Sequence, residues 1–190
     1  MRLDKYLQTK YNLKSRTYAE NLVKTGCVLV DGKIASKTSL DVDEKNVIEV
    51  KNDDGYASQG AFKLEKAFED FSVDVQRKIC ADIGCSNGGF TDCLLRHGAE
   101  RVIAVDVAEC ALPENLLNSG KVDFLRANAR ELPQDFPTVD FLCSDLSFIS
   151  LEYVLKEMYR VLKSGGEAIV LIKPQFELDR SALNKSGIVT

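Results

Sequence analysis

Three charged side chains lie at positions that could form a catalytic site in a fold of alternating strands and helices. Asp145 and Lys173 each end an apolar run typical of a buried strand, and Lys63 lies in a predicted helix. A lysine is normally protonated at neutral pH, so a lysine that acts as a base must be buried or lie beside a second positive charge. We therefore predict that Lys173 removes a proton, that Lys63 supplies the neighbouring charge, and that Asp145 orients the amine. Alternatively, Lys63 lies on a solvated helix face and Asp145 caps the segment after it.

A glycine-rich turn precedes Asp145 and Lys173 in the chain. The segment D-I-G-C-S-N-G-G-F starts at Asp82, within a short apolar run, and leads into a predicted helix over residues 90–97. Its spacing differs from the G-x-G-x-x-G that holds a dinucleotide pyrophosphate. It is similar to the D-x-G-x-x-x-G-G-F form of S-adenosylmethionine (SAM)-dependent methyltransferases, in which glycines let the backbone approach the ligand.

That similarity implies SAM as the cofactor. Asp82 would orient the turn or receive the amino group of SAM, and Asp106, at the end of the next predicted strand, would accept hydrogen bonds from ribose hydroxyls. Taken alone, the turn fits equally well a nucleotide-binding fold that transfers no methyl group. The predicted cofactor-binding residues are Asp82, Gly84, Ser86, Gly88, Asp106 and Asp145.

The elements that must position these residues alternate along the chain. Apolar strands separated by helices are typical of a parallel sheet covered on both faces, and such sheets bind ligands at the carboxyl ends of their strands. We predict an α/β fold with a doubly wound, Rossmann-like methyltransferase sheet. Its strands are predicted at 79–83, 101–106, 122–125, 139–145 and 168–173, and its helices include 90–97 and 151–162.

The start of the chain has a different character. Its first 30 residues hold six Lys+Arg against two Asp+Glu, whereas the whole chain carries a net charge of -4. Two short amphipathic helices are predicted, followed by a hairpin that turns at Asp31-Gly32. The motifs R-L-D-K-Y-L, S-R-x-x-A and G-x-V-x-V-D-G-K resemble the S4 RNA-binding domain, a small α+β fold.

The S4 resemblance implies that basic residues of this segment contact RNA phosphates, which supply affinity without sequence choice. The alternative is a solvated, basic helix face. We expect residues 1–55 to form the S4-type domain with its linker, and residues 56–190 to form the methyltransferase domain. The predicted RNA-binding residues are Lys5, Lys14, Arg16, Lys24 and Lys33.

Composition excludes several other classes of protein. At 45% hydrophobic residues, the chain can bury a substantial core. Six cysteines form no C-x-x-C pair and His97 is the single histidine, so we expect no metal. We find no apolar leader and no long apolar run, and we therefore expect a cytoplasmic protein without membrane contact.

The motifs taken together resemble one family over essentially the whole chain. S-Q-G-A-F-K-L-E-K-A, D-I-G-C-S-N-G-G-F, D-L-S-F-I-S-L and K-P-Q-F-E follow the order and spacing of the TlyA family. These are FtsJ-like ribosomal RNA 2′-O-methyltransferases with an N-terminal S4 domain, historically described as haemolysins. The resemblance implies methylation of a cytidine ribose in ribosomal RNA, with ribosomal subunits as partners. It also implies a Lys-Asp-Lys-Glu catalytic tetrad whose first three members match Lys63, Asp145 and Lys173.

The sequence departs from the family pattern at several points. Gln59 and Ala61 stand where the family usually has Arg and Gly, which puts RNA contacts there in doubt. Glu177 lies too close to Lys173 to be the fourth tetrad residue, which we expect beyond Thr190. Five strands are predicted where the family fold has seven, so we expect a chain shortened at its C-terminus.

The sequence allows two alternative functions. The first is a haemolytic or membrane-active protein, which dose-dependent lysis without SAM would indicate. The second is a non-catalytic RNA-binding or ribosome-assembly factor, which SAM binding without methyl transfer would indicate.

Overall fold

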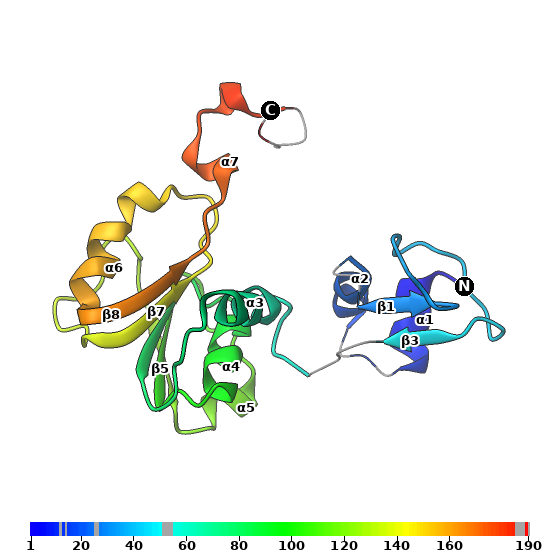
Figure 1. The fold of residues 1–190 in the computed structure, drawn as a ribbon, viewed down its shortest axis with the longest axis horizontal. Helices are drawn as coiled ribbons and strands as arrows, with labels where there is room; N and C mark the ends of the chain where they lie inside the picture. Colours follow the sequence, from blue (N-terminus) through cyan, green and yellow to red (C-terminus); the bar gives the residue numbers. More distant parts are fainter. Residues whose placement is uncertain (12, 14, 25–26, 51–54, 185–188, 190) are drawn as a thin grey trace. The chain divides into compact units, whose positions relative to one another are not determined.

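The computed structural model describes residues 1–11, 13, 15–24, 27–50, 55–184 and 189. Two compact units divide the chain, one over residues 1–59 and the other over residues 60–190 (Figure 1). Each unit has its own hydrophobic core and is described by itself.

The N-terminal unit packs two helices against a small antiparallel sheet with the strand order β2-β1-β3. Asp31 and Gly32 both have positive φ and connect Val30 to Lys33 in the tight turn that the sequence predicts. Apolar side chains of both helices are fully buried, which is why the helices hold against the sheet. The elements are α1 (Leu3–Lys10), α2 (Arg16–Lys24), β1 (Val28–Val30), β2 (Lys33–Ile34) and β3 (Ile48–Val50).

A buried carboxylate joins the start of this unit to its second helix. The side chain of Asp4 is fully buried, and its Oδ2 accepts hydrogen bonds from Arg2 Nη2 and Arg16 Nη2, both at 2.8 Å. The hydrogen bond from Arg2 and the pairing with Arg16 outweigh the effect of burial and hold the pKa of Asp4 well below its usual range. Asp4 therefore stays charged at neutral pH and fixes the position of both arginines.

The C-terminal unit contains a parallel five-stranded sheet with the order β6-β5-β4-β7-β8. Figure 1 shows α6 on one side of this sheet and α3 and α4 on the other. Alternate residues of each strand face opposite sides of the sheet and pack against the helices there. On one side, α6 covers the larger apolar cluster. These layers confirm the predicted doubly wound α/β fold. The elements are α3 (Ala61–Phe71), β4 (Ile79–Ile83), α4 (Gly89–Arg96), β5 (Arg101–Asp106), α5 (Glu114–Leu117), β6 (Val122–Arg126), β7 (Val139–Ser144), η1 (Leu151–Tyr153), α6 (Leu155–Val161), β8 (Leu162–Val170), α7 (Pro174–Glu177) and η2 (Arg180–Ala182).

Two predicted boundaries near the C-terminus are wrong. The predicted helix over 151–162 is divided into η1 and α6, and the predicted strand over 168–173 instead starts at Leu162 and ends at Val170. Leu162 already pairs with Val139, and the register then shifts, so that Glu167 pairs with Phe141. Because β7 ends at Ser144, the ladder has no partner for residues after Leu171, whose N–H donates to the Ser144 carbonyl. Lys173 therefore follows the strand instead of ending it.

We predict that Asp4→Asn destabilises the N-terminal unit by about 1–3 kcal/mol, because both arginines lose a charged acceptor. The pKa of Asp4 is depressed on folding, so its contribution is present above a pH of about 4 and is lost as the pH falls further. Hydrogen exchange of α1 and α2, followed by mass spectrometry on the full chain, should show faster exchange in the variant. Asp41→Asn, on a side chain that is 90% exposed, is the control. Equal exchange in the two variants would contradict this role for Asp4.

Candidate active site

One carboxylate lies between two ammonium groups at the carboxyl edge of the sheet. Asp145 Oδ2 lies 2.7 Å from Lys63 Nζ, and Asp145 Oδ1 lies 2.7 Å from Lys173 Nζ. Lys63 comes from the first turn of α3, Asp145 directly follows β7, and Lys173 precedes α7. The structure thus brings together all three residues that the sequence singled out, although 110 positions separate the first from the last.

The two lysines differ in exposure. The side chain of Lys63 is 49% exposed, whereas those of Lys173 and Asp145 are each 18% exposed. Burial disfavours the charged form of Asp145, but hydrogen bonds and charges from Lys173 and Lys63 outweigh it, so the pKa of this carboxyl lies below its usual value. Asp145 is therefore ionised at neutral pH and can orient both amines.

A serine completes the surroundings of the more buried lysine. Lys173 Nζ donates a hydrogen bond to Ser147 Oγ at 2.7 Å, in addition to its ion pair with Asp145. These two partners fix the amine from two sides. Sequence reasoning missed Ser147, whose only signal was its place two residues after Asp145.

The end of β7 is fastened to the glycine-rich turn. Ser144 Oγ donates to the carbonyl of Ile83, the last residue of β4, at 2.8 Å. Gly84 follows with φ +90°, and a Cβ on it would lie 2.8 Å from Leu146 Cδ2. Gly88, with φ +83°, would place a Cβ 2.8 Å from Leu112 Cδ2. Both glycines are needed for the backbone conformation and for close packing of the turn.

Asp82 anchors the helix that follows this turn. Its side chain is buried, Oδ2 accepts a hydrogen bond from Thr91 Oγ1 at 2.7 Å, and Oδ1 has no hydrogen-bond partner among the described residues. Burial raises the pKa of Asp82 to about 7, against the hydrogen bonds from Thr91. A buried carboxyl oxygen without a partner is costly in a folded protein and points to a ligand group.

Asp106 holds the other side of the same turn. Its Oδ2 accepts from the Ser86 N–H and its Oδ1 from the Ala108 N–H, both at 2.9 Å. The N–H groups of Gly84 and Cys85 donate to the carbonyl of Val105. The predicted cofactor-binding residues therefore surround one turn at the carboxyl ends of β4 and β5.

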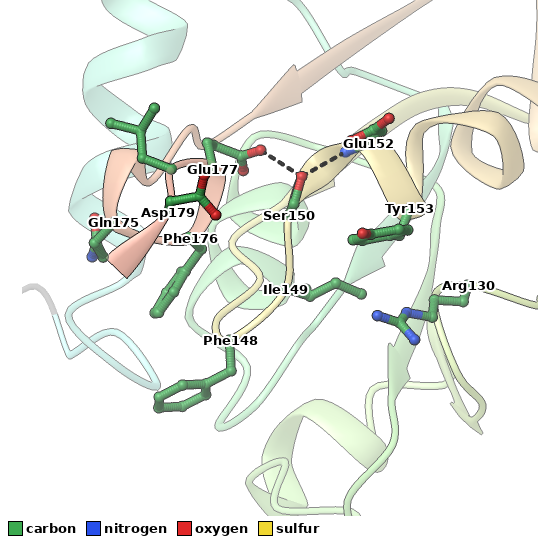
Figure 2. Close-up of a pocket in the computed structure, with 11 residues that line it drawn as sticks. Arg130, Phe148, Ile149, Ser150, Glu152, Tyr153, Gln175, Phe176, Glu177 and Asp179 are labelled. Carbon is green, nitrogen blue, oxygen red and sulfur yellow. Dashed lines mark hydrogen bonds between the residues drawn. The ribbon is translucent and has the colours of Figure 1, made fainter. Parts of the chain in front are cut away.

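A cavity of about 520 Å³ lies beside α7 (Figure 2). Glu177 closes one side, because its carboxylate accepts hydrogen bonds from Ser150 Oγ at 2.7 Å and from the Leu151 N–H at 3.1 Å. On the other side, the Arg130 guanidinium lies 4.9 Å from the centre of the Tyr153 ring. Glu177 thus positions the segment that follows Lys173.

Two aromatic rings form the exposed wall of this cavity. Phe148 is 91% exposed and has φ +65°, and its ring lies 5.3 Å from that of Phe176. A left-handed backbone at a bulky residue costs on the order of 1–3 kcal/mol and is concentrated at functional sites. Sequence reasoning missed both rings, although they stand within the motifs D-L-S-F-I-S-L and K-P-Q-F-E.

The predicted RNA-binding residues differ in their surroundings. Lys5 and Lys33 are exposed, while Arg16 is held by Asp4 and lies 3.4 Å from Glu20. Lys14 and the side chain of Lys24 lie outside the described residues. Of this set, the described part of the chain shows Lys5 and Lys33 directed to solvent and Arg16 committed to an internal ion pair.

Comparisons with known proteins agree with this arrangement. Residues 56–190 match the FtsJ-like methyltransferase family, and residues 1–48 match the S4 domain. The chain is 41% identical to Hemolysin A of Brachyspira hyodysenteriae, over 100% of this chain and 80% of that protein. It is 36% identical to the 16S/23S rRNA (cytidine-2′-O)-methyltransferase TlyA of Mycobacterium tuberculosis, over 99% of this chain and 72% of that protein.

A solved structure gives the same result for the fold. A protein from Streptococcus thermophilus, described as a candidate haemolysin, has a TM-score of 0.71 and 33% identity, over 100% of this chain and 71% of that one. The resemblances predicted from the motifs are therefore confirmed. Within the residues that the structure describes, no helix has the length and apolar character needed to cross a membrane.

We predict that Asp82→Asn removes a pH dependence of stability. Because burial raises the pKa of Asp82 to about 7, the native chain keeps a proton that the unfolded chain releases at lower pH. The wild type should therefore lose stability as the pH rises from about 4 to about 7, whereas Asn, which resembles the protonated carboxyl, should not.

Calorimetry of the ligand-free wild type and variant at about pH 5 and about pH 8 measures this difference. Asp135→Asn, an exposed acid outside the site, should follow the wild type. If the melting temperatures of wild type and Asp82→Asn change in parallel with pH, Asp82 does not carry the raised pKa.

Proposed function

This chain belongs to the FtsJ-like methyltransferase family, and on that premise we propose that it transfers a methyl group from SAM to a ribose 2′-hydroxyl of cytidine in ribosomal RNA. The observation that carries the proposal is the Asp145 carboxylate between Lys63 and Lys173, beside the glycine-rich turn. The names of the relatives support the same reaction and substrate class.

The residues around the turn fit SAM. The buried Oδ1 of Asp82 is an acceptor without a hydrogen-bond partner among the described residues, which suits the amino group of the methionine part. Asp106 stands at the end of β5, where the remaining lone pairs of its carboxylate suit ribose hydroxyls. When bound, SAM supplies a methyl group already activated by its sulfonium, so the protein needs chiefly to place that group in line with its acceptor.

The charged residues then act on the acceptor hydroxyl. A ribose 2′-hydroxyl is a poor nucleophile until its proton is removed. Lys173, in its neutral form, takes that proton, and Ser147 and Asp145 hold its amine in place. Lys63 supplies a second positive charge beside Asp145. With SAM bound, the oxygen would gain the methyl group as the sulfonium S–CH3 bond breaks and the neutral thioether leaves, and the lysine would gain the proton.

Aromatic residues suit the nucleotide that carries this hydroxyl. The cavity is lined in part by Phe176, whose ring centre lies 6.0 Å from Lys173 Nζ. An exposed ring at a strained backbone position beside this cavity is a stacking surface for an unpaired base. We assign this contact to Phe148, supported from behind by Phe176. Stacking tolerates any base and so adds affinity without itself selecting cytidine.

The remaining assignments belong to the same proposal. Residues 1–55 form the RNA-binding domain with its linker, and residues 56–190 form the catalytic domain. Lys5, Lys14, Arg16, Lys24 and Lys33 contact ribosomal RNA, with Arg16 acting through its fixed position beside Asp4. For a reaction on ribosomal subunits, we expect the protein to act in the cytoplasm.

We predict that Lys173→Ala lowers single-turnover methyl transfer by about 10²–10⁴-fold, the usual contribution of a general base. SAM binding, measured by calorimetry, should persist, because Lys173 does not hold the cofactor in this account. The assay follows tritium from methyl-labelled SAM into unmethylated ribosomal subunits.

Lys156→Ala, an exposed lysine on α6, is the matched control and should retain wild-type transfer. Transfer by Lys173→Ala at the control rate would contradict the base assignment. SAM binding by the wild type with no transfer to either ribosomal subunit would instead favour a non-catalytic RNA-binding protein.

We predict that Phe148→Ala lowers kcat/KM for ribosomal subunits by the equivalent of about 1–3 kcal/mol, which is the value of one base stack. Phe148→Tyr should stay close to wild type. The readout is kcat/KM for ribosomal subunits, together with SAM affinity, which should not change. The control is Phe71→Ala, which removes another exposed ring that does not line this cavity. Equal losses in the Ala and Tyr variants, or none in either, would rule out stacking.

A further inference from the structure

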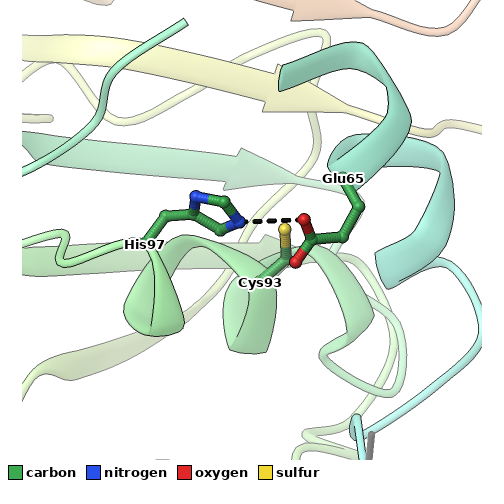
Figure 3. Close-up of side chains that lie close together, drawn as sticks. All are labelled: Glu65, Cys93 and His97. Carbon is green, nitrogen blue, oxygen red and sulfur yellow. Dashed lines mark hydrogen bonds and ion pairs between the residues drawn. The ribbon is translucent and has the colours of Figure 1, made fainter. Parts of the chain in front are cut away.

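A second cluster of reactive side chains lies between α3 and α4 (Figure 3). Cys93 and His97 are four positions apart at the end of α4, so they share one face of that helix. Glu65 on α3 faces them, with its Oε2 2.9 Å from His97 Nε2. One donor atom from each of the three residues lies within 4.8 Å of the other two.

The three donors form a mixed set that suits one class of metal. A thiolate, an imidazole nitrogen and a carboxylate oxygen are the protein ligands of Zn²⁺, at about 2.0–2.3 Å in a tetrahedral arrangement. Such distances place ligand atoms about 3–4 Å apart, so small side-chain movements from the observed separations are sufficient. We propose that Glu65, Cys93 and His97 bind one divalent transition-metal ion of the Zn²⁺ class.

The surroundings of the cluster favour a bound ion that has one coordination position open to solvent. Cys93 is buried, Glu65 is partly buried and His97 is exposed, so the site opens at one side to solvent. Water can supply the fourth ligand there, as in zinc sites with three protein ligands. The Phe68 ring contacts the His97 ring edge to face, with centres 4.9 Å apart, and limits rotation of the imidazole.

Binding requires one proton to leave. Burial raises the pKa of the Cys93 thiol, and the neighbouring Glu65 raises it further. The metal must therefore displace the thiol proton, and it replaces the His97–Glu65 contact with two bonds to the ion. Without metal, His97 and Glu65 form a hydrogen-bonded contact beside a buried cysteine, which is the simpler role of this cluster.

The site would act on the reaction by holding α3. Glu65 lies two residues after Lys63, and a metal bridge to α4 would tie the helix of that lysine to the helix that follows the glycine-rich turn. The site is distinct from Asp145 and Lys173, and it does not depend on the proposed reaction. It escapes the usual sequence rules because its ligands form no C-x-x-C or paired-histidine spacing.

Cobalt titration of the full chain, freed of any affinity tag, tests the site. Co²⁺ replaces Zn²⁺ in such sites and gives a thiolate-to-metal absorption band. We expect one equivalent of Co²⁺ to produce this band, and Zn²⁺ to remove it by displacement. Cys93→Ser should abolish the band, whereas Cys110→Ser, at an exposed cysteine elsewhere, should keep it.

His97→Gln and Glu65→Gln guard against misfolding of the Cys93 variant. His97 is exposed, so its loss should leave the fold intact, and each variant should weaken Co²⁺ binding by at least about tenfold, or about 1.4 kcal/mol. Zn²⁺ should also raise the melting temperature of the wild type more than that of His97→Gln. No thiolate band in the wild type, or a band and affinity unchanged in His97→Gln and Glu65→Gln, would overturn the proposal and leave only the contact between His97 and Glu65.

Discussion

The arrangement of the catalytic unit depends on the largely buried Asp145 carboxylate, which the amines of two lysines contact. A charge withdrawn from water is tolerated only when it is paired and hydrogen-bonded. Here Lys63 donates a hydrogen bond to one oxygen of Asp145, and Lys173 forms an ion pair with the other. The two lysines come from opposite ends of the domain sequence. The ion pairs therefore bring α3 and the segment after β8 to one edge of the sheet, and that edge is where the glycine-rich turn begins.

The parallel sheet fixes where these segments come together. β7 lies between β4 and β8, and the Ser144 hydroxyl joins its last residue to the end of β4. Asp145 is thus fixed relative to the turn that starts at Gly84. Glu177 in turn fastens α7 to Ser150, so Lys173 is held from both sides. Loops of different origin converge because all the strands end at the same edge.

Much of this could be predicted from residue order, because apolar strand patterns give the sheet, and strand-end acids and glycines mark its ligand edge. The exact end of β8 could not be predicted, since it depends on where β7 stops offering hydrogen bonds. The strained backbone of Phe148, the pairing of Arg16 with buried Asp4, and the contact of Glu65 with His97 depend on tertiary packing. Local sequence carries no signal for such contacts.

We infer that the Asp145 charge organises both lysines for proton removal from a ribose hydroxyl. The most direct test compares single-turnover methyl transfer to ribosomal subunits by wild type and by Asp145→Asn, which keeps the shape but removes the charge. At saturating SAM, we expect Asp145→Asn to lose at least about 10²-fold in the transfer rate, with folding intact. Transfer by Asp145→Asn at the wild-type rate would contradict it.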